Sequence, residues 1–145
     1  RASYFAGCAF TKSYVGYVHA VAHSLGGQYN VPHGLANAVL LPYVLEAYGK
    51  TIHKKLAALA VAAGVATKET PVEEAASDFI QAIKDMKARF GIGDFIPEIQ
   101  EEDIPKLSHY ADKEANPLYP VPVLMDAGEL EKFYYMLIPG NLERV

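Results

Sequence analysis

The chain contains a single cysteine, Cys8, and no run of lysine and arginine. One thiol excludes an internal disulfide framework and fits a reducing compartment, so we expect a cytoplasmic protein. Because Cys8 lies between Gly7 and Ala9, we expect its side chain to be a small buried hydrophobe. A nucleic-acid-binding surface needs clustered basic residues to neutralise phosphates. The net charge is −4, so we expect no nucleic-acid partner.

Long apolar stretches are also lacking. A helix that crosses a membrane needs roughly 18 to 20 apolar residues. The best candidate, residues 56–64, is much shorter and follows two lysines. We therefore expect no membrane span. The sequence also lacks a G-x-G-x-x-G loop, the glycine-rich turn that cradles the phosphates of a dinucleotide.

Apolar residues make up 51% of the 145 residues, which is enough for one domain with a sizeable core. They recur at spacings of three and four, a helical period, and no segment alternates as a strand does. The pattern therefore predicts an all-α helical bundle. Its helices are expected over residues 11–24, 34–47, 52–63, 71–90 and 103–114, and from 127 onward.

Several helix ends are predicted from short motifs. Thr51 is expected to cap the helix over 52–63, with Gly64 as its stop. Thr70–Glu73 and Asp126–Glu129 each have the pattern of a capping box at the start of a helix.

Prolines mark other boundaries. The segment 34–47 is apolar on almost every face, which predicts deep burial, and Pro42 within it is expected to kink or end the helix. The proline-rich segment 116–123 is expected to be extended. The tail after Pro139 is expected to fray.

Three of the five histidines lie within fifteen residues, at His19, His23 and His33. His19 and His23 are four apart, so they share one face of a helix. His33 follows two glycines, an asparagine and a proline, the residue types that turn a chain back on itself. Imidazole binds zinc and ferrous iron, so this pattern indicates a metal or catalytic pocket. A metalloprotease helix would need a glutamate where Ala20 stands.

Four segments around these histidines occur in order and without gaps. They are Gly-Cys-Ala-Phe (7–10), Gly-Tyr-Val-His-Ala-Val-Ala-His (16–23), Leu-Gly-Gly-Gln-Tyr-Asn-Val-Pro-His-Gly (25–34) and Ala-Asn-Ala-Val-Leu-Leu-Pro (36–42). Together they resemble the iron-containing (group III) alcohol dehydrogenase family. A weaker resemblance continues through residues 91–93, 103–107 and 116–122. It thus covers residues 1–145 and implies the all-α C-terminal metal-binding domain of an iron alcohol dehydrogenase or dehydroquinate-synthase-like fold.

The resemblance implies roles for four residues. In the family, the positions that match His19 and His33 bind the catalytic divalent metal, usually Fe²⁺ and sometimes Zn²⁺. The position that matches His23 lies beside the nicotinamide and is implicated in proton movement or cofactor placement. The position that matches Phe10 lines the space between nicotinamide and substrate. The implied reaction interconverts a primary alcohol and an aldehyde, with NAD or NADP as the hydride carrier.

Parts of the family's machinery have no counterpart in these residues. The family's metal has two further ligands, an aspartate and a histidine four residues later, and no Asp-x-x-x-His occurs here. We therefore expect this chain to be the C-terminal part of a larger dehydrogenase, inactive alone, with an N-terminal α/β dinucleotide-binding domain upstream of Arg1. Without that partner, apolar surface around residues 10–45 should favour self-association, so we expect a homo-oligomer.

Two alternatives stay open. One is the domain of a zinc-dependent polyol dehydrogenase of the glycerol type, because the fold is shared. The other is a stand-alone helical module without catalysis. The unbroken Asn-Val-Pro-His-Gly and Val-Leu-Leu-Pro sequences favour the alcohol branch. The remaining histidines, His53 and His109, are expected to lie outside any site.

Overall fold

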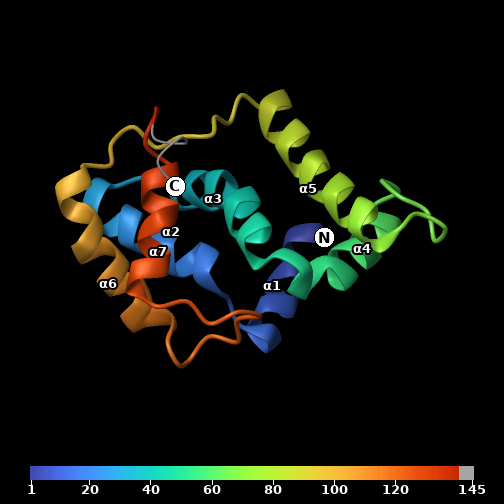
Figure 1. Cartoon of the computed structure of the whole chain (residues 1–145), viewed down its shortest axis with the longest axis horizontal. Helices are drawn as coiled ribbons and strands as arrows, with labels where there is room; N and C mark the ends of the chain where they lie inside the picture. Colours follow the sequence, from blue (N-terminus) through green and yellow to red (C-terminus); the bar gives the residue numbers. More distant parts are fainter. Residues whose placement is uncertain (141–145) are drawn as a thin grey trace.

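The computed structural model describes residues 1–140, and every regular element in that part is a helix (Figure 1). The predicted all-α class is therefore confirmed. The elements are α1 (Ala2–Ser13), α2 (Tyr17–Tyr29), α3 (His33–Tyr48), the 3₁₀ turn η1 (Gly49–Ile52), α4 (His53–Ala62), α5 (Val72–Arg89), the 3₁₀ turn η2 (Glu101–Asp103), α6 (Ile104–Ala115) and α7 (Ala127–Met136).

The core forms where α2 packs against both α3 and α6, and α6 packs against α7. Val21 and Leu25 of α2 and Leu40 and Val44 of α3 are completely buried. Burying a side chain of this size stabilises the fold by about 1.5–3 kcal/mol relative to leaving it in water. The predicted deep burial of α3 is therefore confirmed. Pro42 lies inside α3, which continues to Tyr48, so this proline does not end the helix.

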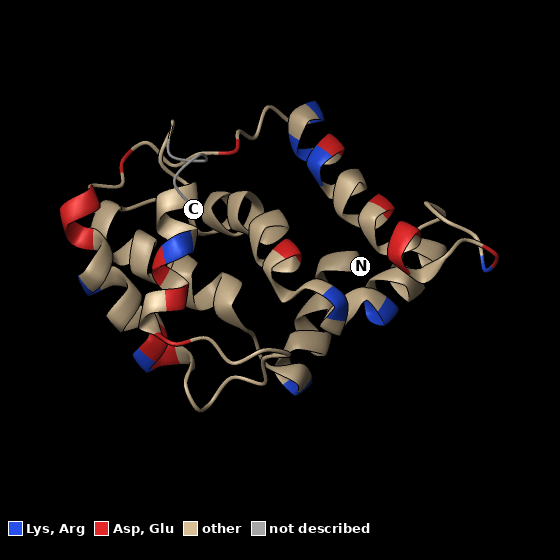
Figure 2. Cartoon of the chain, in the orientation of Figure 1, with Lys and Arg blue, Asp and Glu red and all other residues tan. Residues whose placement is uncertain are grey.

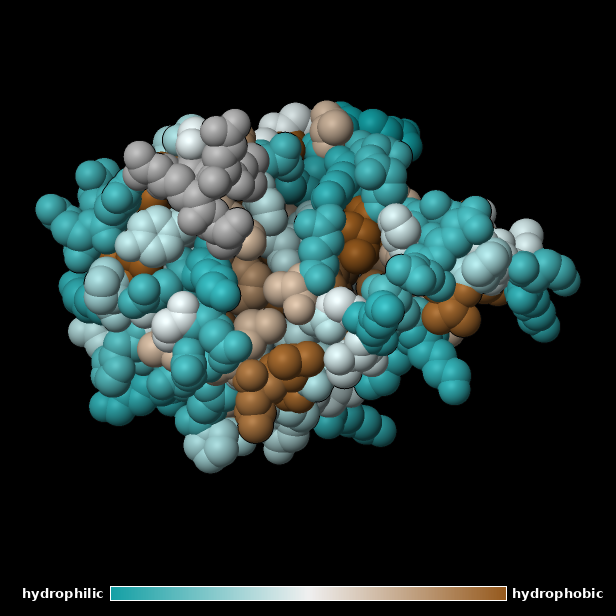
Figure 3. Space-filling model, in the orientation of Figure 1, coloured by the Kyte–Doolittle hydropathy of each residue, from teal (hydrophilic) through white to brown (hydrophobic). Residues whose placement is uncertain are grey.

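Helices α4 and α5 form a separate hairpin at the other end of the molecule (Figure 1). The hairpin meets the rest of the chain through η1 and α3. Figure 3 shows apolar side chains gathered in the hollow between α5 and the body. Figure 2 shows acidic and basic residues interspersed along α5. Among residues 1–140, no helix is long and apolar enough to cross a membrane.

The predicted helix over 11–24 is wrong, because the chain breaks there into two helices. Helix α1 ends at Ser13, Tyr14 takes a positive φ of 61°, and α2 begins only at Tyr17. The apolar residues keep their helical spacing across the break, so this spacing did not predict the break. No residue of α1 is buried, and Cys8 is exposed, contrary to the expected burial.

The capping predictions had mixed outcomes. The Asp126–Glu129 box is confirmed: the Asp126 carboxylate accepts from the Glu129 N–H (2.9 Å), and the Glu129 carboxylate accepts from the Asp126 N–H (3.0 Å). The Thr70–Glu73 box is wrong, because the Thr70 hydroxyl accepts from the Thr67 N–H instead and Pro71 takes the N-cap position. Thr51 also fails as a cap, since the chain already turns helically from Gly49.

The segment after α6 does not run extended. The Asn116–Pro117 peptide is cis, and the Tyr119 N–H donates to the Ala115 carbonyl at 2.7 Å. The chain turns at the end of α6 and then loops outward before it returns to α7 (Figure 1). Gly64 and Gly91 both take positive φ beyond the ends of α4 and α5, where glycine has no Cβ to clash. The fraying predicted after Pro139 falls mostly on residues 141–145, which lie outside the described part.

The Asp126 capping box provides a test of local stability. We expect Asp126→Ala to lower the free energy of unfolding by about 1 kcal/mol, because the Glu129 N–H in the first turn of α7 loses its acceptor. Urea denaturation measures this as a shift in midpoint with an unchanged slope. Thr51→Ala is the control and should leave the midpoint in place, since Thr51 makes no capping bond. Equal effects of the two substitutions would contradict the assignment.

Candidate functional site

The three clustered histidines meet at the junction of α2 and α3. Helix α2 ends at Tyr29, the following Asn30 reverses the chain with a positive φ of 57°, and α3 starts at His33. This short return brings the His33 ring beside both histidines of α2. The ring centroids lie 5.3 Å apart for His19 and His33, 5.2 Å for His23 and His33, and 5.9 Å for His19 and His23. The structure thus brings together three histidines whose proximity the sequence spacing only suggested.

The hydrogen-bond partners distinguish the three rings. The Nδ1 atom of His23 lies 2.6 Å from Oε1 of Glu114 on α6. The Nε2 atom of His33 lies 2.9 Å from the side-chain amide nitrogen of Asn37, one turn along α3. His19 is half-buried between them, on the α2 face that carries His23. The rings are therefore close together but held by different neighbours.

The electrostatic surroundings favour a neutral His19. Burial lowers the pKa of this imidazole, and the rings of His33 and His23 lower it further, whereas the carboxylate of Glu114 opposes the shift. A neutral imidazole has a free nitrogen lone pair, which is the form that binds a metal ion. Desolvation and the neighbouring imidazoles thus favour the neutral form of His19.

The residues fit part of a metal site. Within residues 1–140, no group of three or more His, Cys, Asp or Glu side chains is placed to hold a metal ion alone. Nδ1 of His23 is engaged by Glu114 and Nε2 of His33 by Asn37, so each of these rings offers its other nitrogen beside the imidazole of His19. The side-chain oxygen of Asn37 is buried without a hydrogen-bond partner next to His33. Such an orphaned polar atom indicates a site whose partners are incomplete.

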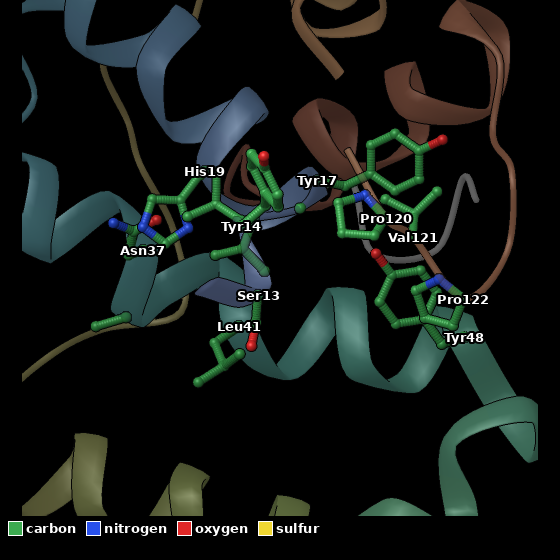
Figure 4. A pocket seen from close by; sticks show the side chains of 14 residues that line it. Ser13, Tyr14, Tyr17, His19, Asn37, Leu41, Tyr48, Pro120, Val121 and Pro122 are labelled. Atoms are coloured by element: carbon green, nitrogen blue, oxygen red, sulfur yellow. The ribbon is translucent and has the colours of Figure 1, made fainter. Parts of the chain in front are cut away.

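An apolar cavity of about 470 Å³ opens beside His19 (Figure 4). The segment 13–18 between α1 and α2 forms one wall, Leu41 of α3 a second, and Pro120–Pro122 a third. Figure 4 shows His19 and Asn37 together at one side of this space and the Pro120–Pro122 segment at the opposite side. Tyr48 lines the far end, where burial raises the pKa of its phenol to about 12. Tyr48 therefore keeps its proton at neutral pH.

A buried polar cluster fastens the third wall to α2. The hydroxyl of Tyr17, which is completely buried, accepts from the Met125 N–H (2.9 Å) and donates to the Asn116 side-chain oxygen (2.9 Å). The Asn116 amide in turn donates to the Met125 carbonyl (2.9 Å) and to Asp112 (2.7 Å). Tyr17 therefore holds both ends of the 116–125 segment.

The other residues singled out in the sequence lie elsewhere. Phe10 sits on α1, is 55% exposed and does not line the cavity, so its predicted role beside a nicotinamide stays a prediction. His109 is exposed, and its ring is tilted by 45° against that of Tyr110, as expected for a residue outside the site. Glu114 was not identified from the sequence. It lies 91 positions from His23, and no local pattern links residues so far apart.

The Tyr17 cluster generates a second stability test. We expect Tyr17→Phe to lower the free energy of unfolding by about 1–3 kcal/mol, because the buried Met125 N–H and the Asn116 side chain each lose a partner. The matched control is Tyr110→Phe, whose hydroxyl belongs to a 53% exposed side chain and should matter little. Thermal unfolding of both variants measures the difference. An unchanged midpoint for Tyr17→Phe would argue against the cluster.

Comparison with known proteins shows which family and which relatives the chain is similar to. Residues 1–135 match the family described as "Fe-containing alcohol dehydrogenase family, C-terminal". The chain is 40% identical over 117 residues to the 1,3-propanediol dehydrogenase of Citrobacter freundii, covering 79% of this chain and 30% of that protein. It is 36% identical over 110 residues to the lactaldehyde reductase of Escherichia coli, covering 74% of this chain and 29% of that protein.

The chain is also similar in fold and sequence to a solved structure. The alcohol dehydrogenase from Oenococcus oeni superposes with a TM-score of 0.81 and 34% sequence identity. The superposition covers 91% of this chain and 35% of that chain. The present chain therefore spans about a third of the length of the proteins that it matches.

Proposed function

This chain belongs to the iron-containing alcohol dehydrogenase family, whose C-terminal domain it represents, and we propose that the protein it forms part of interconverts a primary alcohol and an aldehyde. The hydride carrier in this proposal is NAD or NADP. The observation that carries the proposal is the meeting of His19 and His33 beside an apolar cavity. The cavity offers space for the carbon chain of a small alcohol, with the imidazole of His19 at its edge.

His19 and His33 are the residues that would hold a divalent metal, with Fe²⁺ as the first choice and Zn²⁺ as the alternative. Such a metal, when bound, supplies Lewis acidity toward an alcohol or carbonyl oxygen and lets an alcohol proton leave near neutral pH. The lowered pKa of His19 keeps its nitrogen available for this binding. The orphaned oxygen of Asn37 lies at the same edge and favours a further polar partner there.

His23 has a different role in the proposal. Its Nδ1 is occupied by Glu114, so it serves the reaction through the other ring nitrogen, where it accepts or returns the proton of the alcohol. Leu41, Val121 and Pro122 are apolar walls that exclude water from the carbon chain. Phe10 is proposed to contact the nicotinamide once the remaining part of the protein is in place.

The proposal includes a partner domain. We assign the two missing metal ligands and the dinucleotide-binding α/β domain to a segment outside residues 1–145. The exposed aromatic side chains of α1, with Tyr4 72% and Phe5 64% exposed, support a covering partner for that helix. A homo-oligomer and a cytoplasmic location complete the proposal, and the exposed free thiol of Cys8 fits a reducing compartment.

Metal analysis of the full-length protein tests the assignment of ligands. We expect His19→Ala and His33→Ala each to reduce metal affinity by more than the roughly 10–100-fold that loss of an outer partner costs. His23→Ala should keep the metal and lose turnover. The control, His109→Ala, removes an exposed imidazole outside the site and should change neither property. Full metal content in His19→Ala would contradict the proposal, and tight zinc with preference for a polyol would favour the zinc alternative.

The isolated chain gives an independent test. With two donor imidazoles in place of four ligands, it should bind iron or zinc weakly and show no NAD-linked alcohol oxidation. Titration with each metal, followed by an assay for reduced nicotinamide, measures both properties. Stoichiometric submicromolar binding together with activity would show that the site is complete without a partner. If the full-length protein also binds no metal and oxidises no alcohol, the hypothesis of a stand-alone helical module without catalysis is favoured.

A further inference from the structure

We infer that Glu114 is the positioning residue of His23, with Tyr119 holding its carboxylate, so that His23 presents a proton-accepting Nε2. The kinetic part of this inference rests on the proposed function, whereas the placement of the ring does not. The interaction joins α2, α6 and the segment that follows α6. None of these residues is linked by a short motif in the sequence.

The direction of the hydrogen bond follows from the chemistry of the partners. Glu114 is the penultimate residue of α6, and its Oε1 lies 2.6 Å from His23 Nδ1. A carboxylate only accepts hydrogen bonds, so the proton lies on Nδ1. In a neutral imidazole the second nitrogen then carries the lone pair. Glu114 thus selects the ring form whose Nε2 can accept a proton.

Tyr119 restrains the carboxylate from the other side. Its hydroxyl donates to the same oxygen of Glu114 at 2.8 Å, and its backbone N–H donates to the Ala115 carbonyl at 2.7 Å. Burial raises the pKa of the Tyr119 phenol, and the hydrogen bond to Glu114 raises it further, so the hydroxyl remains a donor. The two bonds fix Tyr119 against the end of α6. Glu114 therefore accepts from two donors held on different segments.

The same contact sets how the His23 ring lies among its neighbours. The His23 ring stacks on His33 at 5.2 Å with an interplanar angle of 21° and lies 5.9 Å from His19. The bond to Glu114 ties Nδ1 toward α6 and so fixes the direction in which Nε2 points. Lys106 lines the same pocket as His23 and Glu114, but its ammonium donates to Gln28 (3.1 Å) and leaves Glu114 to His23 and Tyr119.

The ring form of His23 is measured directly by nitrogen NMR. In the 145-residue chain labelled with ¹⁵N-histidine, we expect the wild-type His23 to carry its proton on Nδ1. Glu114→Ala should shift the ring toward the mixture of forms found in free imidazole. Glu114→Gln retains an oxygen that accepts from Nδ1–H and should restore most of the wild-type pattern. Unchanged His23 signals in Glu114→Ala would overturn the inference, as would a wild-type proton on Nε2.

Turnover of the full-length protein supplies the second readout. We expect Glu114→Ala to lower kcat by about 10-fold or more, with the KM for the alcohol and the metal content unchanged, because the ring is misplaced while the ligands remain. Tyr119→Phe should lower kcat less, in the same direction. The matched control is Glu74→Ala, which removes an exposed carboxylate from the first turn of α5. Loss of metal in Glu114→Ala would overturn the positioning role.

The two arms separate the inference from the proposed function. If the wild-type full-length protein holds no metal and oxidises no alcohol, the proposed function is wrong. The kinetic part of the inference is then wrong as well. The NMR arm then still decides whether Glu114 sets the His23 ring. Circular dichroism establishes that each variant folds. If Glu114→Ala does not fold, Glu114→Gln and Tyr119→Phe carry the decision, since each must keep the Nδ1–H form for the inference to hold.

Discussion

The return between α2 and α3 is the constraint on which the site depends. Asn30 reverses the chain with a positive φ, and α3 begins at His33 almost at once. The buried side chains of Val21, Leu25 and Leu40 then lock the two helices together. A longer loop would give His33 more freedom, whereas this one places its ring within 5.3 Å of His19 by centroid. The packing of α2 against α3 and the clustering of the histidines therefore both depend on this turn.

Around this turn, the polar side chains of the site come from elements that lie far apart in the sequence. Helix α6 contributes the carboxylate of Glu114, and the segment after it contributes Tyr119. The Tyr17–Asn116 bond anchors that segment to the start of α2 and so holds one wall of the cavity. The site is thus a shared surface of α2, α3, α6 and the 116–125 segment.

The sequence predicted those features that depend on neighbours along the chain. The helical class follows from apolar spacing, and the shared face of His19 and His23 follows from their separation of four. The Asp126 capping box formed as expected, since both partners lie within one turn. The same type of motif failed at Thr70, where a bond to Thr67 in the preceding turn was available instead. The break at Tyr14 was also missed, because periodicity continues across it.

Residue order by itself determined the helical class, the four-residue spacing of His19 and His23 and the chain reversal before His33, because each depends on contacts between near neighbours. It also carried the resemblance to a family. Only the tertiary structure decided that His23 meets Glu114 and that His19 is half-buried, whereas Asn37 meets His33 one turn along the same helix. The physical reason is distance along the chain. The packing of α2 against α6 brings together groups that no local pattern connects.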